Sequence, residues 1–249
     1  MIHDDSKTTN ASPAVASPHN RGIQLGDPDL AAAASHSLNE DSALALLQRA
    51  DLQPDLIEKL SKTAAAAKSR KVNLAIVKHP NAPRYVSLSV IRHLFTFDLM
   101  RVALTPVVVG DLKMAAEEVL INRLETVSAG EKLSLARRAS GRVAGAILLD
   151  NEPHIIAAAL ENPRLTEAFV AKALLHHQAS SALVRAVCSH TKWSLRGEIR
   201  IALLRNEHTP LEYAVGFAKS LPSDVVREIL QNSRLPENVR ICLAQRRDL

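Results

Sequence analysis

Apolar residues recur along most of the chain at the spacing of amphipathic helices. From about residue 71, stretches of about 10–13 residues carry apolar positions at i, i+3, i+4 and i+7. No segment alternates apolar and polar residues with period two over a comparable length, so the pattern predicts an all-α protein of short helices. The clearest stripes are Phe169, Val170, Ala173 and Leu174; Leu183, Val184, Val187 and Cys188; Leu195, Ile199, Ala202 and Leu203; and Leu211, Ala214, Val215, Ala218 and Leu221.

Polar breaks of one type separate these stripes. In the break after residue 205, we expect Asn206 to close one helix in the left-handed conformation and Thr209 to cap the next. Pro210 suits the first turn of that helix, and Glu212 completes a capping box with Thr209. This interpretation predicts that Thr209→Ala costs about 1 kcal/mol and Asn206→Val more. Related breaks are Asn162–Thr166, Asn232–Pro236 and His79–Pro83.

Other helix starts carry capping signals. Asn39 precedes the first helical pattern. Asp55 and Glu58 have the spacing of a capping box, and so do Ser128 and Glu131.

An internal duplication joins distant parts of the chain. When Ala82 and Pro83 are aligned with Thr209 and Pro210, about 40 residues match at an offset of 126–127. This offset predicts three units of about 42 residues, because intermediate anchors fit that spacing. The anchors His79, Asn122, Asn162 and Asn206 are 43, 40 and 44 residues apart, although Asn122 falls within a helix expected to run from Asp111.

This period and these breaks resemble known helical repeats. Units of 40–47 residues with two or three helices resemble HEAT and armadillo repeats, and the Asn-x-x-x-Pro/Thr breaks resemble those of leucine-rich-repeat-variant proteins. The resemblance covers about residues 71–249 and implies a right-handed α-solenoid that works as a binding scaffold. A compact globular bundle is the alternative, but short helix pairs cannot bury their apolar stripes without stacked neighbours.

The pattern divides the chain into three parts. Residues 1–37 are rich in Ser, Ala, Asn and Pro and are expected to form a disordered tail. Residues 38–70 are expected to form an N-terminal helical segment that caps the repeats, and residues 71–249 the HEAT-like repeat domain.

The composition indicates which residue types form the core and in which compartment the protein is expected. Apolar residues make up 47% of the chain and aromatic residues only 3%, so the core must consist mainly of Leu, Ile, Val and Ala. Cys188 and Cys242 lie in apolar patterns, which favours buried free thiols in a reducing compartment. No signal peptide and no apolar stretch of membrane-spanning length is visible, so we expect a cytoplasmic protein without a membrane partner.

Catalytic and cofactor motifs are not visible in the sequence. It contains no phosphate-binding glycine loop, no Gly-x-Ser-x-Gly elbow and no His-Glu-x-x-His helix, so we expect no enzyme activity and no cofactor. The best candidate for a metal site is the group His176, His177, Cys188 and His190. This candidate is weak, because the adjacent His176 and His177 side chains diverge by about 100° on a helix, and we expect no metal site. Helix-end or surface roles are expected for Glu117, Glu118, Asp150, Glu152 and Glu161.

The charge distribution bears on the choice between a protein-binding scaffold and a nucleic-acid binder. The net charge is +5, with −2 over residues 1–70 and +7 over residues 71–249. We therefore expect a non-catalytic scaffold that binds another macromolecule, foremost a protein; a nucleic-acid binder is the alternative, and a HEAT-like enzyme such as a DNA glycosylase is less favoured. Trp193 is either a binding hot spot or a staple between helices. The candidate basic face is Arg137, Arg138, Arg142, Arg185, Arg196 and Arg200.

Overall fold

A computed structural model describes residues 39–245 of the chain. These residues form 16 helices and no strand, which confirms the predicted all-α class. The tail expected at residues 1–37 lies outside the described residues. None of the helices in the described part is long and apolar enough to cross a membrane.

Short helices follow one another with brief turns. The N-terminal half contains α2 (Glu40–Leu47), α3 (Pro54–Ser61), α4 (Ala64–Lys68), α5 (Arg70–Lys78), α6 (Arg84–Ile91), α7 (Thr96–Leu104) and α8 (Gly110–Arg123). The C-terminal half contains α9 (Ala129–Arg138), α10 (Gly141–Ile147), α11 (Pro153–Leu160), α12 (Glu167–Leu175), α13 (Ser181–Ser189), α14 (Gly197–Leu204), α15 (Leu211–Lys219), α16 (Ser223–Gln231) and α17 (Glu237–Gln245).

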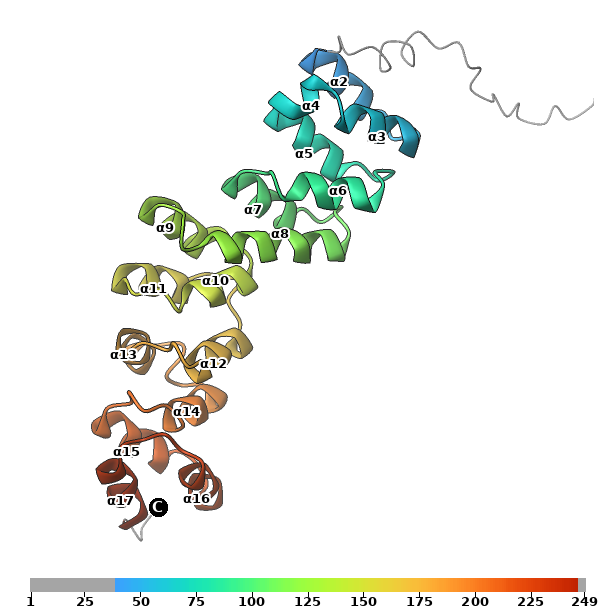
Figure 1. The fold of residues 1–249 in the computed structure, drawn as a ribbon. Coiled ribbons are helices and arrows are strands. Elements are labelled where there is room, and N and C mark those ends of the chain that lie inside the picture. The colour runs from blue at the N-terminus through green and yellow to red at the C-terminus, as the bar shows by residue number, and fades with distance from the viewer. Residues whose placement is uncertain (1–38, 246–249) are drawn as a thin grey trace, which may run out of the picture.

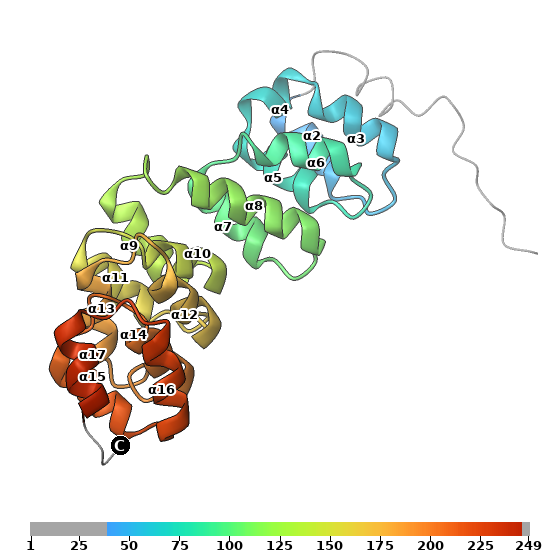
Figure 2. The same cartoon turned by 60° about the horizontal axis from the view of Figure 1, so that its bottom comes forward.

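The helices stack in two rows to form an elongated molecule (Figure 1). The first row contains the odd-numbered helices from α5 to α17, and the second row the even-numbered helices from α6 to α16. Along the second row α6 packs on α8, α8 on α10, α10 on α12, α12 on α14 and α14 on α16. Figure 2 shows the C-terminal helices of the stack from another side, still in the same two rows. A continuous apolar cluster runs from Val77 to Leu243, and a second one covers the N-terminal helices.

The stacking unit is shorter than the predicted 42 residues. Successive first-row helices from α9 onward begin at 129, 153, 181, 211 and 237, so one pair of helices occupies 24 to 30 residues. Asn162 follows α11 in the first row, whereas Asn206 follows α14 in the second, so their spacing spans three helices. The pattern that repeats in the sequence is therefore one helix with its turn, and this unit occurs in both rows. Asn122 lies inside α8, as expected from the sequence.

Side chains from several turns bond to the end of an earlier helix in the stack. The last carbonyl groups of a helix have no partner within that helix. Asn162, directly after α11, donates from its Nδ2 to the carbonyl oxygens of Ala136 (2.7 Å) and Ala139 (3.1 Å) at the end of α9. Its Oδ1 accepts the backbone N–H of Arg164 at 2.8 Å, which closes its own turn. One buried amide thus serves two successive repeats.

The same arrangement recurs along both rows. Asn206 donates to the carbonyl oxygen of Leu174 (2.6 Å) at the end of α12 and accepts the N–H of His208 (2.8 Å). In each further case a side chain that follows one helix reaches a carbonyl at or just beyond the end of an earlier helix, which is the preceding helix of the row for Trp193 and Ser233 and is α2 for His79. These pairs are His79 with Arg49 (2.9 Å), Trp193 with Leu160 (2.9 Å) and Ser233 with Leu204 (2.6 Å).

The predicted caps are confirmed in part. Asn39 caps α2, and Ser128 with Glu131 forms a complete capping box at α9. The prediction for Thr209 is wrong, because Pro210 precedes α15 and the buried Thr209 hydroxyl donates to the carbonyl of Leu203 at 2.6 Å. The box predicted from Asp55 and Glu58 is also wrong: α3 begins after Gln53 without a side-chain cap, and the Glu58 carboxylate accepts from Lys62.

Asn206→Val is expected to lower the free energy of unfolding by about 1–3 kcal/mol, because it leaves the buried Leu174 carbonyl without its donor. Asn232 is the control, because this asparagine directly after α16 is exposed and has no side-chain hydrogen bond among the described residues, whereas the neighbouring Ser233 makes the bond equivalent to that of Asn206. Asn232→Val should change stability by less than about 0.5 kcal/mol. Urea unfolding followed by circular dichroism measures both, and equal losses would contradict the inter-repeat role of Asn206.

Candidate functional site

The six arginines of the predicted basic face have different environments. Arg137 and Arg138 are exposed at the end of α9, and Arg196 is exposed directly before α14. Arg142 forms ion pairs with Glu117 (3.6 Å) and Glu118 of α8, so its charge is locally neutralised. Arg137, Arg138 and Arg196, together with the exposed Arg185 of α13, carry the exposed charge of the predicted face.

The remaining two predicted arginines, Arg185 and Arg200, bond to uncharged groups of nearby residues. Arg185 lies in the middle of α13, and its Nε donates to the carbonyl of Ser181 at 3.3 Å. Arg200 is half-buried, with its Nε donating to the Ser194 carbonyl at 2.8 Å and its guanidinium 5.8 Å from the centroid of the Phe217 ring. These contacts favour a packing role for Arg200.

The turns that lead from a first-row helix to the next second-row helix form one edge of the stack, which we call the forward edge. Hydrogen bonds and ion contacts join three of these turns in succession. Arg164 donates from its Nη1 to the carbonyl of Arg138 at 3.3 Å. His190 Nε2 then lies 3.2 Å from the Oε1 of Glu161 in the following step. The turns after α9, α11 and α13 are therefore contiguous.

Five basic side chains of this edge form no ion pair with any carboxylate of the described residues. Two of them, Arg164 and Lys192, were missed from the sequence because only the stacking places them beside the predicted arginines. Three carboxylates, of Glu161, Glu167 and Glu198, lie on the same turns and helix starts. We call this set the basic segment: Arg137, Arg138, Arg164, Lys192 and Arg196.

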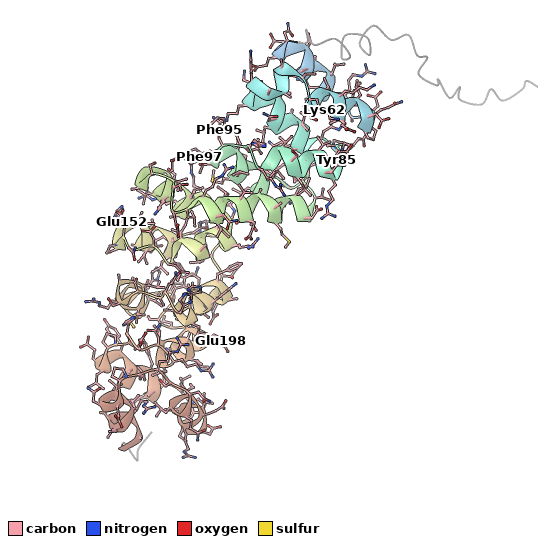
Figure 3. The ribbon with its side chains drawn as sticks, in the orientation of Figure 1. Lys62, Tyr85, Phe95, Phe97, Glu152 and Glu198 are labelled. Carbon is pink, nitrogen blue, oxygen red and sulfur yellow. The ribbon has the colours of Figure 1, made fainter. Side chains whose placement is uncertain are left out.

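The forward edge continues toward the N-terminus as an apolar surface. Arg84 of α6 pairs with Asp111 of α8, and Arg142 of α10 donates to the Met114 carbonyl at 3.4 Å, so the starts of these three helices are neighbours. In Figure 3, Tyr85 and Phe95 lie at opposite ends of α6, with Tyr85 on the forward edge. Large apolar side chains are 61% to 77% exposed in this region, which we call the apolar segment: Tyr85, Val107, Val109 and Met114.

The candidate metal ligands of the sequence do not meet. His176 and His177 lie on the turn after α12, whereas Cys188 is buried in α13 and His190 contacts Glu161 on the forward edge. Burial raises the pKa of the Cys188 thiol to about 12, so this cysteine remains a thiol near neutral pH. Within residues 39–245, no three potential metal ligands come together.

The carboxylate of Asp150 is fully engaged by neighbouring groups. It accepts hydrogen bonds from Lys132 Nζ at 2.8 Å and from the backbone N–H of Glu152 at 2.9 Å. Burial acts to raise the pKa of Asp150, but the bond from Lys132 and the backbone N–H groups outweigh it and hold this pKa below its ordinary value. The pair lines a cleft of about 540 Å³ between the turns after α8, α10 and α12. An ionised carboxylate with both oxygens bonded suits a structural ion pair better than acid–base chemistry.

Comparison of the chain with protein-family models, with curated proteins and with solved structures gave no match. The likeness to HEAT and leucine-rich-repeat-variant proteins is thus one of sequence pattern.

Proposed function

We propose that this protein is a non-catalytic interaction scaffold that binds a protein partner along its forward edge. The partner segment has acidic residues that contact the basic segment and apolar residues that contact the apolar segment. The right-handed α-solenoid and the cytoplasmic location expected from the sequence are part of this proposal.

One observation carries the proposal. Along a single edge, exposed apolar side chains at the starts of α6 and α8 are followed by basic side chains without ionic partners at the turns after α9, α11 and α13. Exposed apolar surface is typical of protein interfaces, and unpaired charges of one sign attract a partner of the opposite sign. An extended partner segment with an apolar part and an acidic part is complementary to the apolar segment and the basic segment, which follow each other along the forward edge.

The composition of the edge favours a protein over a nucleic acid. Leu195 is 69% exposed beside Arg196, and most of the apolar segment is aliphatic. Binding of single-stranded nucleic acid commonly uses aromatic side chains on which bases stack. Trp193, the aromatic residue nearest the basic segment, is buried and holds the Leu160 carbonyl. The basic segment alone would also attract phosphates, so nucleic acid is the natural competitor in the test.

The test uses a synthetic peptide with a leucine-rich half and a glutamate-rich half. Fluorescence anisotropy with the full-length protein should show saturable binding at physiological salt. Changing Arg137, Arg138, Lys192 and Arg196 to Gln is expected to weaken it by about tenfold or more, because the acidic half loses its counter-charges. The matched control changes four exposed basic residues off this edge to Gln and should retain the parent affinity: Lys59, Lys68, Arg101 and Arg227.

Two further arms decide between the classes of partner. A peptide whose leucines are replaced by serine should bind more weakly, because it cannot cover the apolar segment. Polythymidylate and random duplex DNA should bind weakly at physiological salt. Tighter binding of either nucleic acid than of the peptide, with a steep salt dependence lost in the fourfold edge variant, would overturn the protein-scaffold proposal.

A further inference from the structure

A second, smaller pocket lies where second-row helices end and first-row helices begin, on what we call the return edge. It has a volume of about 160 Å³ and lies between the turns after α12, α14 and α16. Leu174, Leu175 and Ala179 supply its apolar wall. The polar lining comes from His176, His177, Arg205, Asn206, Glu207, Asn232 and Arg234.

Two hydrogen-bond donors in this pocket have no acceptor among the described residues. The Nε of Arg205 is buried and has no hydrogen-bond partner among the described residues. His176 accepts the backbone N–H of Gln178 on its Nδ1 at 3.2 Å, so in the neutral ring the proton is on Nε2. That Nε2 donates to no described residue. Of these two donors only the Arg205 Nε is buried; a buried donor without an acceptor is costly, and a bound acceptor would remove this cost.

The two arginines of the pocket come from successive turns. The backbone N–H of Arg234 donates to the carbonyl of Arg205 at 3.3 Å, so these residues are direct neighbours across the repeat. Neither guanidinium forms an ion pair with a carboxylate of the described residues. Glu207 is the one acidic residue in the lining; it is exposed, and its Oε1 lies 3.9 Å from His208 Nε2.

We propose that this pocket binds a phosphoryl group, a dianion with several acceptor oxygens. Arginine is suited to this ligand because its planar fork donates two parallel hydrogen bonds to an oxyanion. The His176 ring and the exposed Asn232 amide also line the pocket and add donors to those of the two arginines. A pocket of about 160 Å³ is small beside the roughly 300–1,000 Å³ of sites that enclose a whole ligand, so the remainder of the ligand lies outside.

Calorimetric titration of the full-length protein with inorganic phosphate tests the site directly. Arg205→Lys and Arg234→Gln should each weaken binding by about tenfold, because each removes a charge-assisted fork. Glu207→Gln should strengthen it, since it removes the one negative charge of the lining. Arg227→Gln, an equal charge change on the exposed face of α16, should leave binding unchanged. Unfolding midpoints of all variants show whether each remains folded.

The source of the phosphoryl group is distinguished by two more ligands. A phosphoserine peptide that binds much more tightly than phosphate, while phenyl phosphate does not, assigns the site to a phosphorylated partner. Comparable tightening with phenyl phosphate assigns it to small phosphate monoesters. The proposal fails if phosphate does not bind, or if binding is the same in the parent, Arg205→Lys and Arg234→Gln. Because the pocket lies on the return edge, this outcome is independent of the forward-edge experiment.

Discussion

Trp193→Ala is expected to lower the free energy of unfolding by about 3–5 kcal/mol, the usual cost of removing a large buried aromatic side chain. The Trp193 side chain is only 2% exposed and lies on the turn between α13 and α14. Its Nε1 donates to the Leu160 carbonyl at 2.9 Å, at the end of α11. The substitution therefore leaves a cavity between two repeats and also removes the donor that serves a buried carbonyl.

Trp193→Phe separates these two effects. Phenylalanine fills most of the space but cannot donate, so we expect a loss of about 1–3 kcal/mol, the cost of an unsatisfied buried carbonyl. Urea unfolding followed by far-ultraviolet circular dichroism suits both variants, because each removes the single tryptophan that fluorescence would report. A Trp193→Ala protein as stable as the parent would favour the hot-spot interpretation over the staple.

Gly141→Ala is expected to cost about 3 kcal/mol, at the upper end of the penalties for overpacking. A Cβ atom at Gly141 would lie 2.2 Å from the carbonyl oxygen of Arg164, a backbone atom that cannot rotate away. One turn later in α10, a Cβ at Gly145 would lie 2.9 Å from the Cβ of Phe169. The two glycines allow α10 to approach α12 and its preceding turn closely. The clash would shift this turn and disturb the Asn162 bonds to α9.

Gly216→Ala is the matched control for this prediction. Gly216 lies in the interior of α15, is exposed, and a Cβ there meets no atom within 4 Å. Alanine favours the helix by about 0.5–1 kcal/mol over glycine, so this variant should be more stable than the parent. Thermal and urea unfolding compare the two directly. Stabilisation by both substitutions would show that α10 and α12 are not in close contact.

Local sequence patterns predict the helices and several of their ends. The apolar period predicts the buried face of α13 and most of that of α14, because a stripe at i, i+3 and i+4 leaves only one side of a helix apolar; Leu195, predicted to belong to the α14 stripe, lies before the helix and is exposed. Ser128 and Glu131 form the predicted capping box, since such a cap involves residues only three positions apart. Trp193 was recognised from the sequence as a possible staple. Each of these features depends on local chemistry within one or two helical turns.

Which turns are neighbours depends on how the helices stack and cannot be read from local patterns. Asn162 reaches carbonyl groups 23 and 26 residues earlier, and Asn206 reaches one 32 residues earlier. The sequence of the breaks does not reveal these bonding partners. All the turns have similar residue patterns, and a side-chain hydrogen bond between two turns has no fixed sequence separation. Because the turns are so similar, the predicted spacing of about 42 residues matched turns that are three helices apart and therefore belong to opposite rows.

The candidate sites depend still more on the stacking. Arg142 belonged to the predicted basic face, but α8 brings Glu117 and Glu118 to it and neutralises its charge. Arg164 and Lys192 joined that surface only because the turns after α9, α11 and α13 are contiguous. A hydrophobic period specifies which face of each helix is buried, whereas the pairing of helices depends on how all the apolar faces are covered at once, and this pairing determines which charges become neighbours.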